Sequence, residues 1–318
     1  MTNLELIACG MGLPTKSFTN EDLTRTVDTS DEWITTRTGI RSRYFCTGEE
    51  SNFTMAYAAA KSAIKRAGIA TEDIGCVVCA TITSDYVTPS LACMLQNRLG
   101  LSEEIPALDI NGACSGFLYA TEVARGFLST SNKSYALVLG VEQLSRITDM
   151  TDRSTCVLFG DGGAAAIYKK SDTAPYRSFL GARGGLEITC GGVSHAGNPV
   201  ALTMDGKAVF RFAVDAMQRC IERLMQEESL SWDAIDYVLC HQANARIIDH
   251  CVRKMKAPAK KFYKNMDHFG NTSAASIPLA IAELEQNGRL QPGNRLLLVG
   301  FGSGLTWGGA YITYKGSV

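Results

Sequence analysis

Short apolar runs of strand length alternate along the chain with stretches in which apolar residues recur every three or four positions. Residues 62–82, "SAIKRAGIATEDIGCVVCATI", combine the two patterns as a helix, a turn and a buried strand. Residues 217–242, "MQRCIERLMQEESLSWDAIDYVLCHQ", repeat this arrangement in the second half of the chain. Such alternation of helices and buried strands predicts an α/β fold.

These two stretches belong to a long internal repeat. Val77 matches Val238 at an offset of 161 residues, and Gly140 of "SYALVLG" matches Gly300 of "NRLLLVG" at an offset of 160. The closing strands "GGAAAIY" and "WGGAYIT" also match in character, at a shorter offset. A repeat of this length predicts a duplicated domain rather than a solenoid.

The boundary between the two predicted halves lies in the polar stretch of residues 169–178. We therefore expect an N-terminal half of residues 1–172 and a C-terminal half of residues 173–318. The first half carries an excursion between its last two strands, residues 141–162, that is too long for a simple turn. Extra loops on a rigid scaffold often carry function, which makes this excursion a candidate for binding.

Composition and charge narrow the class of protein. The chain has 318 residues, 46% of them hydrophobic and 20% charged, which is typical of a globular protein. The net charge of −1 gives no basic bias toward nucleic acid. We find no apolar run of membrane-spanning length and no signal-peptide pattern. We expect a cytoplasmic protein that neither enters a membrane nor binds nucleic acid.

The 11 cysteines fit a reducing compartment, because no export signal accompanies them. Cys76 and Cys79 form a CxxC pair inside a predicted strand, where residues three apart face opposite sides. The pair therefore does not predict a metal site, and we expect no metal or cofactor.

Cys114 lies in a different setting, at a corner between a short apolar run and a predicted helix. The segment "NGACSGF" surrounds it with small residues, and the apolar positions that follow recur at helical spacing. Backbone N–H groups and the dipole at the start of that helix favour a thiolate. Cys114 is therefore a candidate nucleophile, with a small buried core residue as the alternative.

Two residues of the second half complete a candidate site. His241, one of four histidines, follows directly on the predicted strand "YVLC", at the strand end where α/β sheets place ligands. Asn271 lies 157 residues after Cys114, so the two are predicted to occupy nearly equivalent corners. Taken alone, His241 is also consistent with a structural residue whose hydrogen bonds are made within the protein, and Asn271 with an ordinary turn residue.

Together the three residues indicate acyl transfer through a thioester of Cys114. His241 and Asn271 can both donate hydrogen bonds to a developing oxyanion. No general base is needed if the helix end already favours the thiolate.

At these residues the chain resembles the ketoacyl synthase III family, the initiating condensing enzymes of type II fatty acid synthesis. The similarity runs almost end to end and includes, in family order, "TSDEWITTRTGIRSRY", "NGACSGF", "TDRSTCVLFGDG", "HQANARI", "GNTSAAS" and "GFGSGLTWG". The resemblance implies a homodimer and a thiolase-like fold, with duplicated βαβαβ-type halves in a five-layered α-β-α-β-α arrangement.

The resemblance also implies a decarboxylative Claisen condensation. Cys114 would take an acyl group from acyl-coenzyme A, and malonyl-acyl-carrier-protein would supply the enolate that attacks it. His241 and Asn271 match the enolate-stabilising pair of the family. The oxyanion hole for the acyl group would be the amides of Cys114 and Ser303, although relatives often carry glycine or another small residue at position 303.

Further contacts carry over by the same resemblance. The residues expected to contact coenzyme A are Thr29, Trp33, Arg37, Arg153, Gly206, Phe210 and Asn244. An indole and a guanidinium can sandwich adenine, and arginines suit phosphates. Arg153 lies in the excursion of residues 141–162, so the resemblance implies that this segment takes part in binding coenzyme A.

Two more family features concern the carrier protein and the primer. Arg246, Arg253 and Lys254 can share a helix face, in the region where the family docks its acidic carrier protein. A solvated basic face is the alternative. Thr88 matches the position that reaches across the dimer to close the acyl pocket, and a threonine there predicts room for a longer or branched primer.

Other classes of enzyme and a binding protein remain as alternatives. The spacing of Gly112, Cys114 and Gly116 fits the nucleophile elbow of a hydrolase, with Asp233 or Asp236 as the acid. A hydrolase would not explain the long repeat or Asn271. A papain-like protease shares the order of cysteine, histidine and asparagine but not the local pattern at the cysteine. Thiolases and hydroxymethylglutaryl-coenzyme A synthases need a second cysteine or a glutamate that has no match here. A condensing enzyme of secondary metabolism and a non-enzymatic binding protein stay open.

Overall fold

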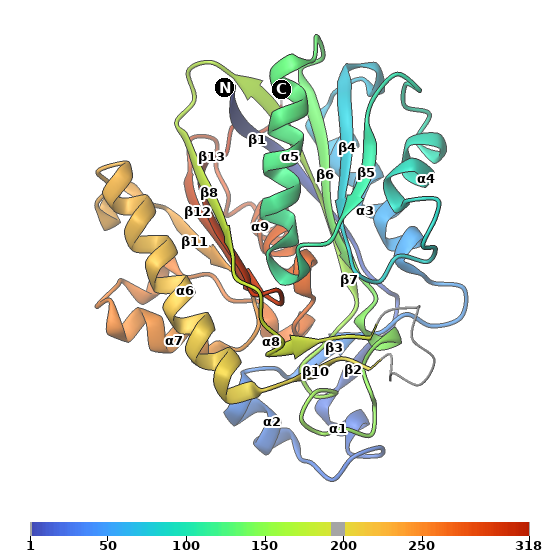
Figure 1. Ribbon diagram of the computed structural model, residues 1–318, viewed down its shortest axis with the longest axis vertical. Helices are drawn as coiled ribbons and strands as arrows, with labels where there is room; N and C mark the ends of the chain where they lie inside the picture. The colour runs from blue at the N-terminus through green and yellow to red at the C-terminus, as the bar shows by residue number, and fades with distance from the viewer. Residues whose placement is uncertain (1, 192–200, 318) are drawn as a thin grey trace.

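Two β-sheets, with helices between them and on both outer faces, form five layers (Figure 1). The computed structural model describes residues 2–191 and 201–317. The first sheet has the strand order β1-β7-β6-β4-β5, in which β4, β5 and β6 are parallel and β7 is antiparallel to its neighbours. Its strands are β1 (Asn3–Gly12), β4 (Ile74–Ala80), β5 (Ala107–Ile110), β6 (Tyr135–Glu142) and β7 (Gly162–Ser171).

The second sheet repeats this order as β8-β13-β12-β11. Its strands are β8 (Tyr176–Ala182), β11 (Tyr237–Cys240), β12 (Arg295–Gly302) and β13 (Thr306–Thr313). The counterpart of β5 is reduced to a single parallel bridge between Val238 and Phe262. Val77 pairs with Leu137 in the first sheet, and Val238 pairs with Leu297 in the second. The matching register confirms the duplication, whereas the boundary after residue 172 stays a prediction.

The helices fill three layers. α5 (Gly116–Thr130) and α9 (Ser276–Gln286) lie between the sheets and contact both. α3 (Asn52–Ala67) and α4 (Leu91–Arg98) cover the outer face of the first sheet, and α6 (Gly206–Glu227) and α7 (Ala245–Lys254) cover that of the second. The expected α-β-α-β-α arrangement is therefore confirmed, and it can be followed from right to left in Figure 1.

The position of α9 explains its composition. A helix that packs on one sheet needs a single apolar stripe, but a helix between two sheets must bury opposite sides. The segment "SIPLAIAEL" accordingly is buried at eight of its nine positions, Glu283 being the exception. Ile277 and Ile281 of α9 join Phe117 and Leu118 of α5 in one central core.

The cysteines of the CxxC pair divide between two cores. Cys76 faces the central core and Cys79 faces the core under α3 and α4, as the strand periodicity predicts. Within residues 2–191 and 201–317, no group of His, Cys, Asp and Glu is arranged to hold a metal ion. The helices described there include none long and apolar enough to cross a membrane.

Smaller elements cluster at the end of the molecule away from the chain termini (Figure 1). They are two short hairpins, β2 (Ser17–Thr19) with β3 (Ser42–Tyr44) and β9 (Ile188–Thr189) with β10 (Thr203–Met204), and three short helices, α1 (Asn20–Leu23), α2 (Asp31–Thr38) and α8 (Met266–Phe269). Single turns of 3-10 helix lie at Thr71–Asp73, Ala113–Ser115, Leu144–Arg146, Trp232–Ala234, Ala259–Lys261 and Ser273–Ala275.

Candidate active site

Cys114 lies in a single 3-10 turn, Ala113–Ser115, that joins β5 to α5. The turn begins with Asn111, whose Oδ1 accepts a hydrogen bond from the Ala113 amide at 3.3 Å, and Ala113 takes a left-handed φ of 45°. Strand β12 approaches so closely that a Cβ on Gly302 would lie 2.8 Å from the Cys114 amide nitrogen. The thiol is thus held at the bottom of a cavity, against the end of a strand from the other half.

Three groups that can donate hydrogen bonds lower the pKa of the Cys114 thiol. They are the backbone amides of Cys114 and Ser303 and the side-chain hydroxyl of Ser273. Despite these groups, burial raises the pKa of the thiol to about 11. This direction is opposite to the expectation that the helix end favours the thiolate, because the desolvation cost exceeds the stabilisation by the donors. Cys114 is therefore a protonated thiol at neutral pH, and its proton must move when the sulfur reacts.

His241 follows β11 and is almost completely buried. Its Nδ1 lies 2.7 Å from the Ser276 hydroxyl at the start of α9, and its ring meets Phe301 edge-on at 5.2 Å. Burial lowers the pKa of His241 to about 3, so the imidazole is neutral at physiological pH. When Ser276 donates to Nδ1, the hydrogen on Nε2 can be donated toward a substrate oxygen.

Asn271 precedes the 3-10 turn Ser273–Ala275, which leads into α9. Its Oδ1 accepts a hydrogen bond from the Ser273 amide at 2.9 Å, so Nδ2 is the donor that this side chain can offer to a substrate. Ser273 has a φ of 49°, nearly that of Ala113. The corners are equivalent as expected, but the turn geometry aligns Asn271 with Asn111 and places Ala274 at the position of Cys114.

Cys114, His241 and Asn271 all line one cavity of about 280 Å³. Its inner wall is largely aliphatic and includes Ile82, Leu144, Val157, Ile188 and Leu202. The cavity also reaches Trp33 and Arg37 of α2 and Arg246 of α7. The three residues that the sequence analysis singled out are therefore brought together from three separate elements, in contact with a common space.

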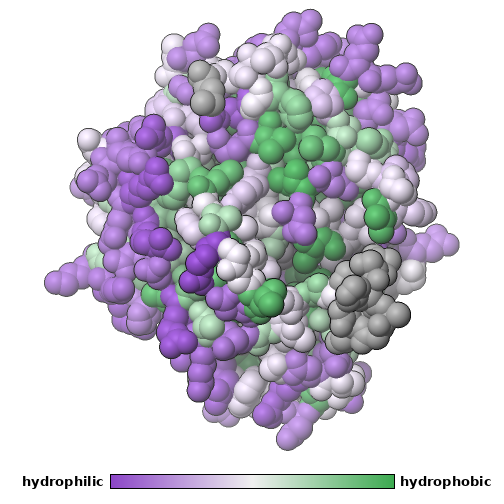
Figure 2. Space-filling model, viewed as in Figure 1, coloured by the Kyte–Doolittle hydropathy of each residue, from purple (hydrophilic) through white to green (hydrophobic). Residues whose placement is uncertain are grey.

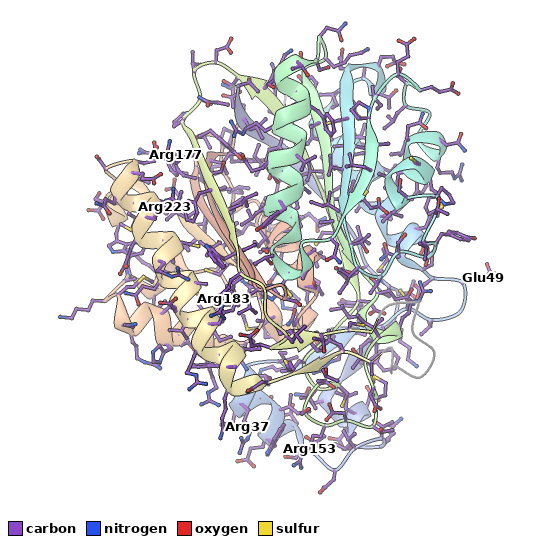
Figure 3. All side chains as sticks on the ribbon, viewed as in Figure 1. Arg37, Glu49, Arg153, Arg177, Arg183 and Arg223 are labelled. Carbon is purple, nitrogen blue, oxygen red and sulfur yellow. The ribbon has the colours of Figure 1, made fainter. Side chains whose placement is uncertain are left out.

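Six of the seven residues expected to contact coenzyme A lie at or near this cavity. The guanidinium groups of Arg37 and Arg153 lie over the Trp33 ring, 4.7 Å and 5.0 Å from its centre. Figure 3 shows the two arginines at the lower end of the molecule. Arg153 also donates a hydrogen bond to the Asp28 carbonyl at 2.8 Å. Gly206, Phe210 and Asn244 line the cavity wall. Thr29 does not line it, and its hydroxyl is buried without a hydrogen-bond partner among the described residues.

The remaining expected residues lie on the surface. Arg246, Arg253 and Lys254 are exposed on α7, and only Arg246 reaches the cavity. Thr88 is exposed in the loop before α4, next to Tyr86 and Val87, and is not part of the cavity wall.

The sequence analysis missed Ser273, Ser276 and Glu142. Glu142 is the single acid in the run "YALVLGVE" of β6, and it is fully buried. An acid at the end of an otherwise apolar strand was the available signal for a functional role. The two serines stand in "GNTSAAS", where nothing in the pattern separates them from capping residues.

Family models match both halves of the chain. Residues 108–184 match the 3-oxoacyl-[acyl-carrier-protein] synthase III model, and residues 225–314 match the model of its C-terminal part. A β-ketoacyl-[acyl-carrier-protein] synthase III from Clostridium botulinum is 41% identical, with 99% of this chain and 100% of the relative covered.

Solved structures agree with these matches. The 3-oxoacyl-[acyl-carrier-protein] synthase III from Aquifex aeolicus superposes with a TM-score of 0.90 at 38% identity, covering 99% of this chain and all of the other. The priming β-ketosynthase of the R1128 polyketide pathway superposes with a TM-score of 0.90 at 30% identity, covering 98% and 96%. The chain belongs to the 3-oxoacyl-[acyl-carrier-protein] synthase III family of acyl-transferring condensing enzymes.

Proposed function

We propose that the chain condenses an acyl-coenzyme A primer with malonyl-acyl-carrier-protein through an acyl group on Cys114. The observation that carries this assignment is the meeting of Cys114, His241 and Asn271 on one cavity. In the first step, the Cys114 thiol gives up its proton, its sulfur attacks the primer thioester, and coenzyme A leaves as a thiolate that takes up a proton. The amides of Cys114 and Ser303, which also lower the pKa of the thiol, are suited to hold the oxyanion that forms beside the sulfur.

In the second step, His241 and Asn271 bind the thioester oxygen of the malonyl group. Loss of carbon dioxide leaves the electron pair of the broken C–C bond on the α-carbon, as an enolate. Two hydrogen-bond donors in a buried site stabilise that charge more than water does. The α-carbon then attacks the acyl-Cys114 carbonyl, a C–C bond forms, and the cysteine sulfur leaves. The product is a 3-oxoacyl-carrier-protein.

The outer part of the cavity supports coenzyme A as the primer carrier. Trp33 offers an aromatic face, and Arg37 and Arg153 supply the positive charge that phosphate groups require. Gly206, Phe210 and Asn244 line the same cavity as Trp33 and Cys114, which suits contacts with a pantetheine arm. Thr29 lies outside the cavity and enters the proposal only as support for α2.

The mouth is also the proposed entrance for the carrier protein. Arg246 lies on its rim, and Arg253 and Lys254 follow on the same helix, exposed to solvent. An acidic carrier protein docked on α7 would place its pantetheine arm at the cavity. Such contacts weaken with salt, so the affinity for the carrier protein is expected to fall as ionic strength rises.

A homodimer is proposed to complete the site. Among the described strands β5 pairs with β4 alone, so one edge of the first sheet is unpaired. Hydrophobic side chains gather over and beside α5 on this face of the molecule (Figure 2). Tyr86 and Val87 are exposed in the loop before α4. A second copy that covers this face would bring Thr88 toward the acyl pocket of its partner.

The choice between fatty acid and secondary metabolism turns on the primer. The polyketide priming enzyme shares this fold at 30% identity, so the fold alone does not select the pathway. The aliphatic inner wall and the threonine at position 88 support a primer longer or more branched than acetyl.

Intact-protein mass spectrometry tests the proposed reaction. The protein is mixed with a panel of acyl-coenzyme A primers, and malonyl-acyl-carrier-protein is then added. We expect a mass gain on Cys114 that is discharged as 3-oxoacyl-carrier-protein, and no gain in the Cys114→Ala variant. Condensation by that variant, or an adduct that only hydrolyses, would overturn the proposal.

A further inference from the structure

Glu142 is a fully buried carboxylate to which the proposed function assigns no role. It ends β6, and its two oxygens accept hydrogen bonds from a ring of neutral groups. The Thr83 hydroxyl donates at 2.5 Å, the Thr81 hydroxyl at 3.3 Å and the Ile82 amide at 3.1 Å. No basic side chain contacts it among the described residues, so nothing compensates its charge as an ion pair would.

The carboxylate reaches the nucleophile through one side chain. The Ser273 hydroxyl donates to Glu142 Oε1 at 3.4 Å. The same side chain lines the cavity with Cys114, and as a hydrogen-bond donor it lowers the pKa of the Cys114 thiol. Ser273 is held in place by its left-handed backbone and by the bond of its amide to Asn271. Ser273 therefore lies between the carboxylate of Glu142 and the site of Cys114.

We propose that Glu142, acting through the Ser273 hydroxyl, accepts the proton of Cys114 when the thiol attacks the primer. The Cys114 S–H bond breaks as a new O–H bond forms on Ser273, and the original Ser273 O–H proton moves to Glu142. The single negative charge moves from the carboxylate to the sulfur, so the buried site never carries two. Once coenzyme A leaves as a thiolate, Glu142 gives up the proton to that thiolate and is again ionised. This inference rests on the proposed role of Cys114.

The alternative acceptor, His241, is the weaker base. Burial raises the pKa of Glu142 to about 7 and lowers that of His241 to about 3. Because burial shifts the two groups in opposite directions, the carboxylate of Glu142 is the stronger base of the two. The titratable group that faces Glu142 from another element is Cys114, whose pKa is raised by the charge of Glu142 as well as by burial.

The charge of Glu142 sets up opposite expectations for Glu142→Gln. If Glu142 only repels the thiolate, the neutral variant has a lower thiol pKa and a more reactive Cys114. If Glu142 accepts the proton, the variant loses its acceptor and Cys114 becomes less reactive. The sign of the change therefore separates the two roles.

The test is the rate of Cys114 alkylation by iodoacetamide from pH 5 to pH 10, followed by mass spectrometry. For the wild-type protein we expect an inflection near pH 7 and a plateau above it. Glu142→Gln and Ser273→Ala should both remove the plateau and slow alkylation at pH 8 by at least about tenfold. Their double variant should be no slower than either, because both break the same path. Faster or unchanged alkylation in Glu142→Gln overturns the inference.

Two controls keep the test interpretable. Ser273→Ala places alanine where Ala113 already tolerates the same backbone in the other half, so folding should survive even if Glu142→Gln unfolds. Glu285→Gln alters another buried carboxylate, bonded to the Cys9 amide and Arg66, and should leave the profile unchanged. If the wild-type protein takes no acyl group from any primer, the proposed function is wrong. If acylation is normal but Glu142→Gln leaves the pH profile of Cys114 alkylation unchanged, only the role inferred for Glu142 is wrong.

Discussion

Asn111 and Asn271 form the same turn in the two halves of the molecule, each accepting a hydrogen bond from the amide two residues ahead. The residues that donate, Ala113 and Ser273, share a left-handed backbone with φ of 45° and 49°. The same turn therefore occurs twice in the fold, once before α5 and once before α9. The first copy carries Cys114, the proposed nucleophile, whereas the second carries Ala274 and places its asparagine on the cavity.

Because His241 and Asn271 are proposed to act on the malonyl group, their loss should spare the first step. In His241→Ala and Asn271→Ala we expect acylation of Cys114 to persist while malonyl decarboxylation falls by at least about 100-fold. Asn271→Asp is the sharper variant, since it keeps the oxygen that binds the Ser273 amide but replaces the Nδ2 donor with a negatively charged acceptor, which would repel an enolate. Release of labelled carbon dioxide measures the second step. Loss of acylation alone in these variants would contradict the division of labour.

Trp33 and its two guanidinium neighbours are proposed to bind the distal end of coenzyme A at the mouth of the cavity. Trp33→Ala should raise the KM for acyl-coenzyme A by about tenfold, which corresponds to about 1.4 kcal/mol of lost aromatic and cation–π contact. The same primer on a truncated pantetheine thioester should react equally with both proteins, because it does not reach Trp33. An equal loss with both donors would instead place Trp33 in the general stability of α2.

Thr88 should control primer length if a second copy covers the face beside α5. Thr88→Phe is expected to shift the preference toward acetyl-coenzyme A, since a bulky ring would fill the end of the acyl pocket. Competition between primers, read by mass spectrometry of the acyl-enzyme, measures this shift. Val87→Phe is the matched control on the same exposed loop. A wild-type preference for acetyl that Thr88→Phe leaves unchanged would argue against the pocket assignment.

The buried carboxyl of Glu142 should make stability depend on pH in a definite direction. Its pKa is raised from 4.5 to about 7 by burial, so the folded state holds the proton more tightly than the unfolded chain. The resulting stabilisation is complete below pH 4.5 and is lost as the pH rises through 7, by about 3 kcal/mol in total. The Glu142→Gln variant should not lose this stability as the pH rises, because glutamine does not titrate.

Urea unfolding at pH 5 and pH 8 measures that effect. The free energy of unfolding of Glu142→Gln, relative to the wild-type protein, should rise by about 2–3 kcal/mol between the two pH values. Titration of the groups that do not interact with Glu142 is common to both proteins and drops out of the difference. A difference that stays constant with pH would show that Glu142 is not protonated in this range.

The alternation of apolar and polar residues and the offset of about 160 residues were enough to predict the α/β class and the duplication. This succeeded because strand and helix periodicities report local burial, and because matching residues such as Val77 and Val238 keep the same register in both sheets. The same reasoning located Cys114, His241 and Asn271, since each stands at the end of a predicted strand or the start of a predicted helix.

What the tertiary structure decided is the environment of those residues. The sequence predicted an easily ionised Cys114 from its helix, but packing of β12 and burial of the sulfur reverse the direction of its pKa. The link between Cys114 and Glu142 depends on Ser273, which lies 159 residues beyond the cysteine and comes from the other half. Local patterns do not encode such contacts, because desolvation and hydrogen bonding are set by atoms that meet only when the two halves pack together.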